Sequence, residues 1–296
     1  MPIRPASPSQ PTPAYTAGPQ GAASAPPAPA PAAGTSRTAD RFDTGPRNPL
    51  SWWAGRPLSE AKNAHRTNTR EDFEAALAHG YNFLEGDVRV ELKAPHALEM
   101  RHDAGDEAGD NLTLAQWLER GAASGRGLKL DVKETDRMPE LLDAVAASGV
   151  PKGRLMINLG DAAMRRWGPL IRERLPGATL ALNPPPGELN GQLTASQVEA
   201  MASLARALGG PVTFVVRMDL LTDAAVRALS PQGPVSVWND PGRPTPVDLG
   251  KAERELRARG VTGVVDLRPG KSASTKAWDG ATGLLDRVRG WLKRLA

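Results

Sequence analysis

The sequence contains no cysteine. Disulfides, thiolate metal sites and cysteine nucleophiles are therefore excluded, and any metal ion must be bound through oxygen or imidazole. The chain also lacks an apolar run of the roughly 18 to 20 residues that a membrane-spanning helix needs, and its first residues lack the apolar core of a secretory signal. From these absences we expect a soluble, cytoplasmic protein, with export by a signal-independent route left open.

Aromatic residues are also scarce, at 4% of the 296 residues, which leaves few rings for stacking on nucleic-acid bases. The Gly-x-x-x-x-Gly-Lys-Ser/Thr loop, the Gly-x-Ser-x-Gly elbow and the His-Glu-x-x-His zinc motif are all absent, which disfavours nucleotide hydrolases, serine esterases and zinc proteases. The net charge of +4 indicates mild attraction to anions such as phosphate esters or lipid headgroups. We expect no nucleic-acid partner.

Residues 1–46 are dominated by proline, alanine, serine, threonine and glycine. Such a segment cannot bury enough apolar surface to offset the entropy of the chain, so we predict a disordered tail. It would act as a spacer or as a partner-binding segment. Residues 47–296 are predicted to form a single monomeric domain.

Within this domain, short apolar runs rich in β-forming residues alternate with helical patterns. Strands are expected at residues 62–65, 82–88, 127–133, 154–159, 179–183, 212–218, 235–239 and 263–267. Eight strand–helix units in about 250 residues match an α/β fold of the (β/α)8 TIM-barrel type. A doubly wound open sheet is the competing fold.

Several helix boundaries are also recognisable. Residues 113–116 and 196–199 match the capping-box pattern, and Gly80, Gly149, Gly177 and Gly209 fall where helices are expected to end. Residues 280–296 form a basic amphipathic pattern. We expect this last segment to be the eighth barrel helix, with peripheral docking to a membrane as the alternative.

Carboxylates gather on one face of two predicted strands. Glu85 and Asp87 project the same way, because side chains alternate along a strand. On the next strand, Lys129, Asp131 and Lys133 share the face opposite a row of apolar residues. Because unpaired charges inside a barrel are costly, this face indicates a site. Glu85, Asp87 and Asp131 would form an all-oxygen cluster for Mg²⁺ or Ca²⁺, while inward salt bridges are the alternative.

Two histidines lie at the ends of the neighbouring segments. His65 ends the first strand, and His102 follows the second strand. Imidazoles on either side of a phosphate would serve as base or nucleophile and as leaving-group acid, with Arg66 and Lys133 holding the nonbridging oxygens. The alternative is that both are hydrogen-bonded packing residues. His79 and His96 are expected to be exposed and are given no role.

The spacing of these residues resembles the amino-terminal signature of glycerophosphodiester phosphodiesterases. The matching residues are Ala64-His65-Arg66, Asn68-Thr69, Phe73 to Ala76, Gly80, Glu85-Gly86-Asp87-Val88 and His102-Asp103, while Val237-Trp238-Asn239 and Gly263 to Asp266 resemble the family's last two strands. The resemblance implies a TIM barrel with His65 and His102 as catalysts and with Glu85, Asp87 and Asp131 as metal ligands. It also implies phosphate contacts from Arg66 and Lys133, and we add Lys129 and Trp238 as substrate contacts.

The sequence departs from that signature at three places. Thr67 stands where the family has glycine, its Pro-Glu before the Asn-Thr is missing, and Asp131 replaces a glutamate. The stretch between His102 and Asp131 is too short for the insertion of the glycerol-specific enzymes, and it is more similar to the menorin family of the same superfamily. Sphingomyelinase D-like enzymes also resemble this chain in using one glutamate and two aspartates.

We therefore predict a metal-dependent phosphodiesterase for a glycerophosphodiester or a related phospholipid headgroup. The product can be that of hydrolysis or of cyclisation. The alternative is a menorin-like barrel that binds phosphorylated or anionic ligands without turnover. Nucleic-acid binding through the basic surface lacks a recognition motif.

Overall fold

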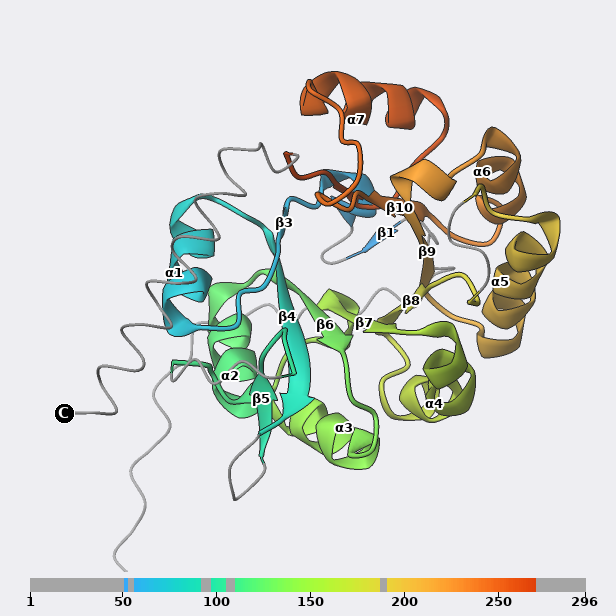
Figure 1. The fold of residues 1–296 in the computed structure, drawn as a ribbon. Coiled ribbons are helices and arrows are strands. Elements are labelled where there is room, and N and C mark those ends of the chain that lie inside the picture. Colours follow the sequence, from blue (N-terminus) through green and yellow to red (C-terminus); the bar gives the residue numbers. More distant parts are fainter. Residues whose placement is uncertain (1–50, 53–55, 92–96, 105–109, 187–190, 270–296) are drawn as a thin grey trace, which may run out of the picture. The chain divides into compact units, whose positions relative to one another are not determined.

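The structure is a computed structural model that describes residues 51–52, 56–91, 97–104, 110–186 and 191–269. Its main feature is a nearly closed barrel of parallel strands surrounded by helices (Figure 1). The predicted tail at residues 1–46 and the predicted last helix at residues 280–296 lie outside the described residues, as does His96.

The barrel contains eight parallel strands. They are β3 (Asn63–Ala64), β4 (Phe83–Val90), β6 (Gly127–Val132), β7 (Leu155–Leu159), β8 (Thr179–Leu182), β9 (Val212–Arg217), β10 (Val235–Trp238) and β11 (Val265–Asp266). Each pairs with the next in chain order, without the reversal that a doubly wound sheet requires. All eight predicted strands are confirmed, and the fold is the barrel.

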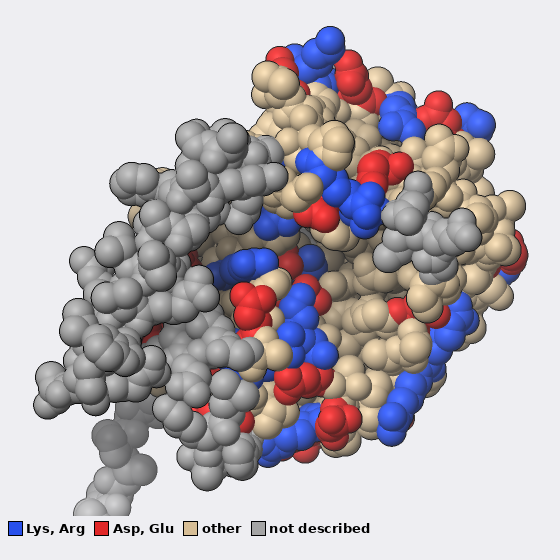
Figure 2. All heavy atoms as spheres, in the orientation of Figure 1, with Lys and Arg blue, Asp and Glu red and all other residues tan. Residues whose placement is uncertain are grey.

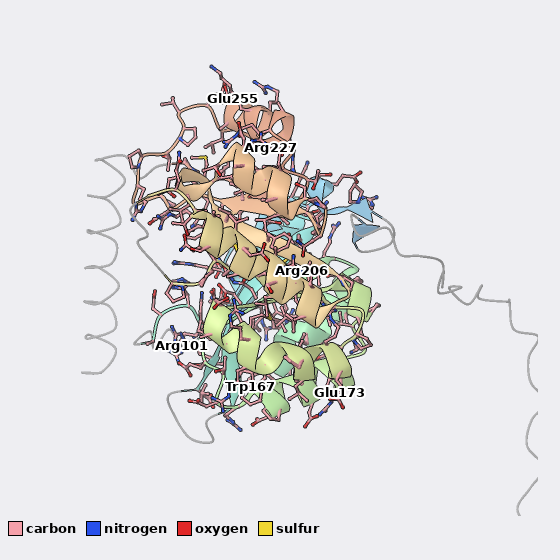
Figure 3. The ribbon with its side chains drawn as sticks, turned by 90° about the vertical axis from the view of Figure 1, so that its right-hand side faces the viewer. Arg101, Trp167, Glu173, Arg206, Arg227 and Glu255 are labelled. Carbon is pink, nitrogen blue, oxygen red and sulfur yellow. The ribbon has the colours of Figure 1, made fainter. Side chains whose placement is uncertain are left out.

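The strands alternate with helices on the outside of the barrel. They are α1 (Arg70–Ala78), α2 (Leu114–Ser124), α3 (Met138–Ala147), α4 (Asp161–Arg174), α5 (Ala195–Leu208), α6 (Asp223–Leu229) and α7 (Leu249–Ala258), with short 3-10 turns at Leu58–Glu60, Lys152–Arg154 and Met218–Leu220. Charged side chains such as Glu173, Arg206 and Glu255 cover the outer helix faces (Figure 3). None of the described helices has the length and apolarity to cross a membrane.

The helix starts follow the predicted chemistry with one correction. Thr113 and Gln116 form a complete capping box at α2, as expected. The predicted box at residues 196–199 is wrong, because the Thr194 side chain accepts from Gln197 N and the Gln197 side chain accepts from Thr194 N. The box therefore lies two residues earlier, and Ser196 is already inside α5. Gly209 does end α5, with φ of +59°.

Two additional strand pairs were not predicted. Strand β1 (Ser51–Trp52) pairs with β2 (Arg56–Pro57), and β5 (Leu98–Met100) runs antiparallel to β4. Both are too short to give a periodic signal in the sequence. Strand β5 ends two residues before His102.

The apolar core has two parts. The larger part fills the space between the strands and the helices and includes Trp117, Leu128 and Phe214. The smaller part lies inside the barrel, where Leu58 and Ala61 pack with Phe83, Met156, Ala181 and Val264. Because Phe83 begins β4 and Val264 precedes β11, this plug fills the amino-terminal end of the barrel and leaves the carboxyl end for a site.

Candidate active site

A single cavity of about 290 Å³ contains every residue predicted to form the site. Those residues are His65, Arg66, Glu85, Asp87, His102, Lys129, Asp131, Lys133 and Trp238. Side chains of both charges gather in and around the central hollow of the face drawn in Figure 2. Phe83, Met156 and Val264 of the plug also line this cavity. Most of its charged residues lie late in the strands or just after them, which is where the active sites of barrel enzymes lie.

Strand β4 separates two environments. Glu85 and Asp87 are buried and line the cavity, with relative exposures of 4% and 1%. Gly86 faces the opposite way, and a Cβ atom there would lie 2.2 Å from Met100 Cε and 2.9 Å from Trp117 Cε2. The glycine between the two carboxylates is therefore required by the packing of α2 against the outer face of β4.

Backbone register brings the third carboxylate to the first two. Asp131 on β6 pairs with Asp87 on β4, and Lys129 pairs with Glu85. One carboxylate oxygen from each of Glu85, Asp87 and Asp131 lies within 4.8 Å of the others. Three carboxylates at this spacing are a suitable donor set for a hard divalent cation such as Mg²⁺ or Ca²⁺.

Two lysines, one on β6 and one directly after it, neutralise these carboxylates. Lys133 Nζ lies 3.0 Å from Asp87 Oδ1 and 2.6 Å from Asp131 Oδ2, and Lys129 Nζ lies 3.1 Å from Glu85 Oε2. Burial lowers the pKa of each ammonium, but the neighbouring carboxylates outweigh it and raise both pKa values. The inward salt bridges considered from the sequence are thus present, and a bound cation would share its ligands with the lysines.

His65 is held between two carboxylates. Its Nδ1 lies 3.1 Å from Glu85 Oε2, and its Nε2 pairs with Asp266 Oδ2. Asn63 donates to the same two oxygens, at 2.7 and 2.8 Å. Burial lowers the pKa of His65, but hydrogen bonds to Asp266 and Glu85 outweigh it and raise the pKa to about 9. A cation on Glu85 would offset part of this effect.

The turn after His65 is fixed to β4. Arg66 has a left-handed backbone with φ of +55°, a conformation that is uncommon for a residue with a side chain. Thr67 is buried, donates from its backbone N and its Oγ1 to Glu85 O, and accepts from Trp117 Nε1. Asn68 donates to Asp87 Oδ2 at 3.0 Å. The departure at Thr67 therefore has a structural role that glycine could not fill.

His102 has a hydrogen-bonding pattern that defines its tautomer. Its Nε2 lies 2.9 Å from Arg66 Nη2, and its Nδ1 lies 2.7 Å from Asp103 Oδ1. A guanidinium only donates, so Nε2 must accept with a lone pair and Nδ1 must carry the proton. With Arg66 in this position, the Nε2 lone pair is occupied by the guanidinium.

Two arginines hold the segment that carries His102. Arg89 Nε donates to His102 O at 2.9 Å, and Arg101 Nη1 donates to the backbone oxygens of Asp103 and Ala104 at 2.6 and 2.7 Å. Arg101 is almost fully buried and also donates to Glu99 Oε1. Three consecutive carbonyls are thus held by guanidinium groups.

Several cavity residues were missed from the sequence. They are Asp266, Asn63, Asn158, Asn183 and Arg268. Asp266 and Arg268 had a usable signal, because charged residues follow the apolar Val264 and Val265 of the last strand. The asparagines had none: Asn183 donates to Asn158 Oδ1, and Asn158 donates to Asp131 Oδ1, and the spacing within one strand does not reveal such contacts between neighbouring strands.

Comparison with known proteins supports this assignment of the fold. Residues 58–159 match the family model of the menorin N-terminal domain. That menorin match covers about a third of the chain and contains both histidines and all three carboxylates of the proposed metal site, but neither Trp238 nor Asp266. The resemblance to the menorin family seen in the sequence is confirmed.

Solved structures share the fold at low sequence identity. A glycerophosphoryl diester phosphodiesterase from Parabacteroides distasonis is 16% identical, with a TM-score of 0.50 over 71% of this chain and 80% of that chain. A protein provisionally assigned the same activity, from Silicibacter pomeroyi, is 17% identical, with a TM-score of 0.50 over 75% of this chain and 94% of that chain. At these identities the likeness concerns the fold alone, and it confirms the barrel that the sequence predicted.

Proposed function

We propose that this chain is a divalent-cation-dependent phosphodiesterase that cleaves a glycerophosphodiester or a related phospholipid headgroup. The observation that supports this most directly is the cluster of Glu85, Asp87 and Asp131, whose oxygens lie within 4.8 Å of one another in a cavity that also contains His65 and His102. Carboxylates that hold a cation between two imidazoles are suited to transferring a phosphoryl group.

The charged residues would divide the binding of the substrate between them. Glu85, Asp87 and Asp131 would hold the cation, which when bound offsets negative charge on the phosphoryl oxygens. Lys133 and Arg66 line the same cavity and would contact the nonbridging oxygens. Lys129 pairs with Glu85, and Trp238 also lines the cavity. Their positive charges would orient the diester before reaction.

The two histidines have different environments, which favours different roles. His102 has its Nδ1 next to Asp103, so its Nε2 would take a proton from the attacking oxygen once Arg66 turns from it to the phosphate. His65 has both ring nitrogens next to carboxylates, so it is suited to hold a proton for the leaving oxygen. The attacking oxygen belongs either to water or to a substrate hydroxyl, and a linear or cyclic product distinguishes the two.

Histidine substitution tests this proposal. Turnover should be measured with glycerophosphodiesters, lysolipids and cyclic phosphates in the presence of Mg²⁺ or Ca²⁺. We expect His65→Ala and His102→Ala each to lower kcat by about 10² to 10⁴, the usual contribution of a general acid or base. His79→Ala is the matched control, because His79 is exposed and ends α1. Unchanged turnover in both site variants would contradict the assignment.

A non-catalytic, menorin-like barrel that binds phosphorylated or anionic ligands is the second candidate. The ion pairs of Lys129 and Lys133 favour it, because they neutralise the carboxylates without any metal. Cation binding by calorimetry together with no turnover across the same panel would support this candidate. A monomeric state, cytoplasmic location and peripheral membrane contact stay predictions from the sequence.

A further inference from the structure

The cavity contains four lysine and arginine side chains, but only two of them have carboxylate partners. Lys129 and Lys133 pair with Glu85, Asp87 and Asp131. Arg66 and Arg268 line the same cavity, and neither has a carboxylate within 4 Å in the part of the chain that the structure describes. Because an unpaired charge in a cavity favours an anionic ligand, each guanidinium marks a position for negative charge.

The backbone of Arg268 is held in place by a buried asparagine. Asn239 follows β10 and is only 2% exposed. Its Oδ1 accepts from Arg268 N at 2.6 Å, and its Nδ2 donates to Arg268 O at 2.8 Å. The guanidinium itself has little to bind, since its Nε is buried without a partner and Nη2 lies 3.5 Å from Asn239 O. A fixed backbone with an unsatisfied guanidinium is typical of a preorganised ligand contact.

The two unpaired guanidiniums lie on different sides of His65. Arg66 Nη2 reaches His102, which follows β5 next to β4. Arg268 Nη2 lies near the carboxyl end of β10, where Trp238 lines the cavity. Strands β10 and β4 are separated by β11 and β3 in the barrel order, and His65 and Asp266 lie between them. One phosphodiester carries a single negative charge, so it would leave one guanidinium without an anion.

We propose that Arg268, positioned by Asn239 in the cavity that Trp238 also lines, forms a second anion-binding subsite. It would select phosphodiesters whose alcohol carries an additional carboxylate or phosphate. This inference rests on the proposed function, which places the scissile phosphate near Arg66 and Lys133. The cavity volume of about 290 Å³ fits a small headgroup diester, and the guanidinium disfavours a purely cationic headgroup.

The test compares glycerophosphoserine with glycerophosphoethanolamine, which differ by one carboxylate. Calorimetry with Mg²⁺ on the His102→Ala variant measures binding without turnover. We expect glycerophosphoserine to bind about tenfold tighter than glycerophosphoethanolamine, because one charge-assisted hydrogen bond adds about that much affinity. Adding Arg268→Gln to His102→Ala should lower this ratio of affinities to about one, because only the binding of glycerophosphoserine is weakened. Arg254→Gln, which removes the same charge from the exposed face of α7, should leave the ratio unchanged.

Equal affinities for the two compounds, or no binding of either, would overturn the subsite. Equal weakening of both by Arg268→Gln would also overturn it, because Arg268 would then bind the diester phosphate itself. Turnover of the same two compounds by the unmodified chain tests the proposed function separately. Tighter binding of glycerophosphoserine without turnover of either compound would contradict the proposed phosphodiesterase activity and support the subsite. Turnover of both compounds with equal affinity would support the activity and contradict the subsite.

Discussion

Two carboxylates and a buried indole meet at Gly86 from opposite faces of β4. Glu85 and Asp87 line the cavity, while Trp117 packs against the outer face. The alternation of side chains along a strand made the shared face of the carboxylates predictable. The residue that leaves no room for a side chain at Gly86 is Trp117. It belongs to α2, which begins more than 25 residues after Gly86 in the chain and packs against β4. That contact has no local signature.

Replacing Gly86 with alanine should destabilise the fold. A Cβ atom would meet Trp117 Cε2 at 2.9 Å, and although Met100 Cε can move, the indole is held by its hydrogen bond to Thr67 O. We expect Gly86→Ala to lower the free energy of unfolding by about 1 to 3 kcal/mol, the usual cost of overpacking. Urea denaturation measures the loss. Gly153→Ala, at a glycine with no atom within 4 Å of the added carbon, is the control.

At the scale of single elements, short segments position the two histidines. The turn from Arg66 to Asn68 is fixed by side-chain bonds to β4, and the segment after β5 is fixed by Arg89 and Arg101. The positions of both histidines at the ends of predicted segments indicated that they would lie near the pocket, because the carboxyl ends of barrel strands meet on one face. The arginine contacts were not predictable, since a buried guanidinium bound to carbonyls looks like a surface residue in the sequence.

Arg101 should be important for stability. Its guanidinium binds Glu99 Oε1 and the backbone oxygens of Val90, Asp103 and Ala104. Arg101→Met would leave these acceptors in a buried environment, so we expect unfolding to become easier by about 3 kcal/mol. Glu99→Gln keeps the carbonyl contacts and should cost only about 1 kcal/mol. Chemical denaturation of both variants measures the two losses in the free energy of unfolding. Equal losses would mean that the ion pair with Glu99, and not the carbonyl contacts, accounts for the stabilisation.

The start of α5 gives a second test at this scale. Thr194 accepts from Gln197 N, whereas Ser196 lies inside the helix. Thr194→Ala should therefore lower the free energy of unfolding by about 1 kcal/mol, and Ser196→Ala should have a much smaller effect. Both values come from denaturant titrations. A larger loss for Ser196→Ala would support the cap that the sequence pattern alone had indicated.

At the scale of the whole molecule, the site is complete only when the barrel nearly closes. Strand β11 meets β3 through Asn63, which donates to Asp266 Oδ2 at 2.8 Å. This contact joins residues about 200 positions apart and brings Asp266 to His65. It also creates a second cluster, of His65, Glu85 and Asp266, whose ligand atoms lie within 4.8 Å of one another. Two clusters that share Glu85 therefore offer alternative positions for one cation.

Cation binding should stabilise the fold through the first cluster. A ligand that binds only the folded chain adds about 2.7 kcal/mol at a concentration of 100 times its Kd, so saturating Mg²⁺ or Ca²⁺ should raise the Tm, and EDTA should reverse the increase. Asp87→Asn should abolish the increase, and Asp266→Asn should retain it. Differential scanning calorimetry measures both. The opposite pattern would place the cation at His65, Glu85 and Asp266.

The sequence alone determined the eight strands, the barrel and the face that carries Glu85, Asp87 and Asp131. These features depend on local periodicity and on the rule that parallel barrel strands end at one face. Only the tertiary structure decided that Asp266 pairs with His65, that Arg66 sets the tautomer of His102, and that Lys129 and Lys133 balance the carboxylates. These contacts join separate segments of the chain and depend on strand register and on closure of the barrel. The spacing of neighbouring residues determines neither of them.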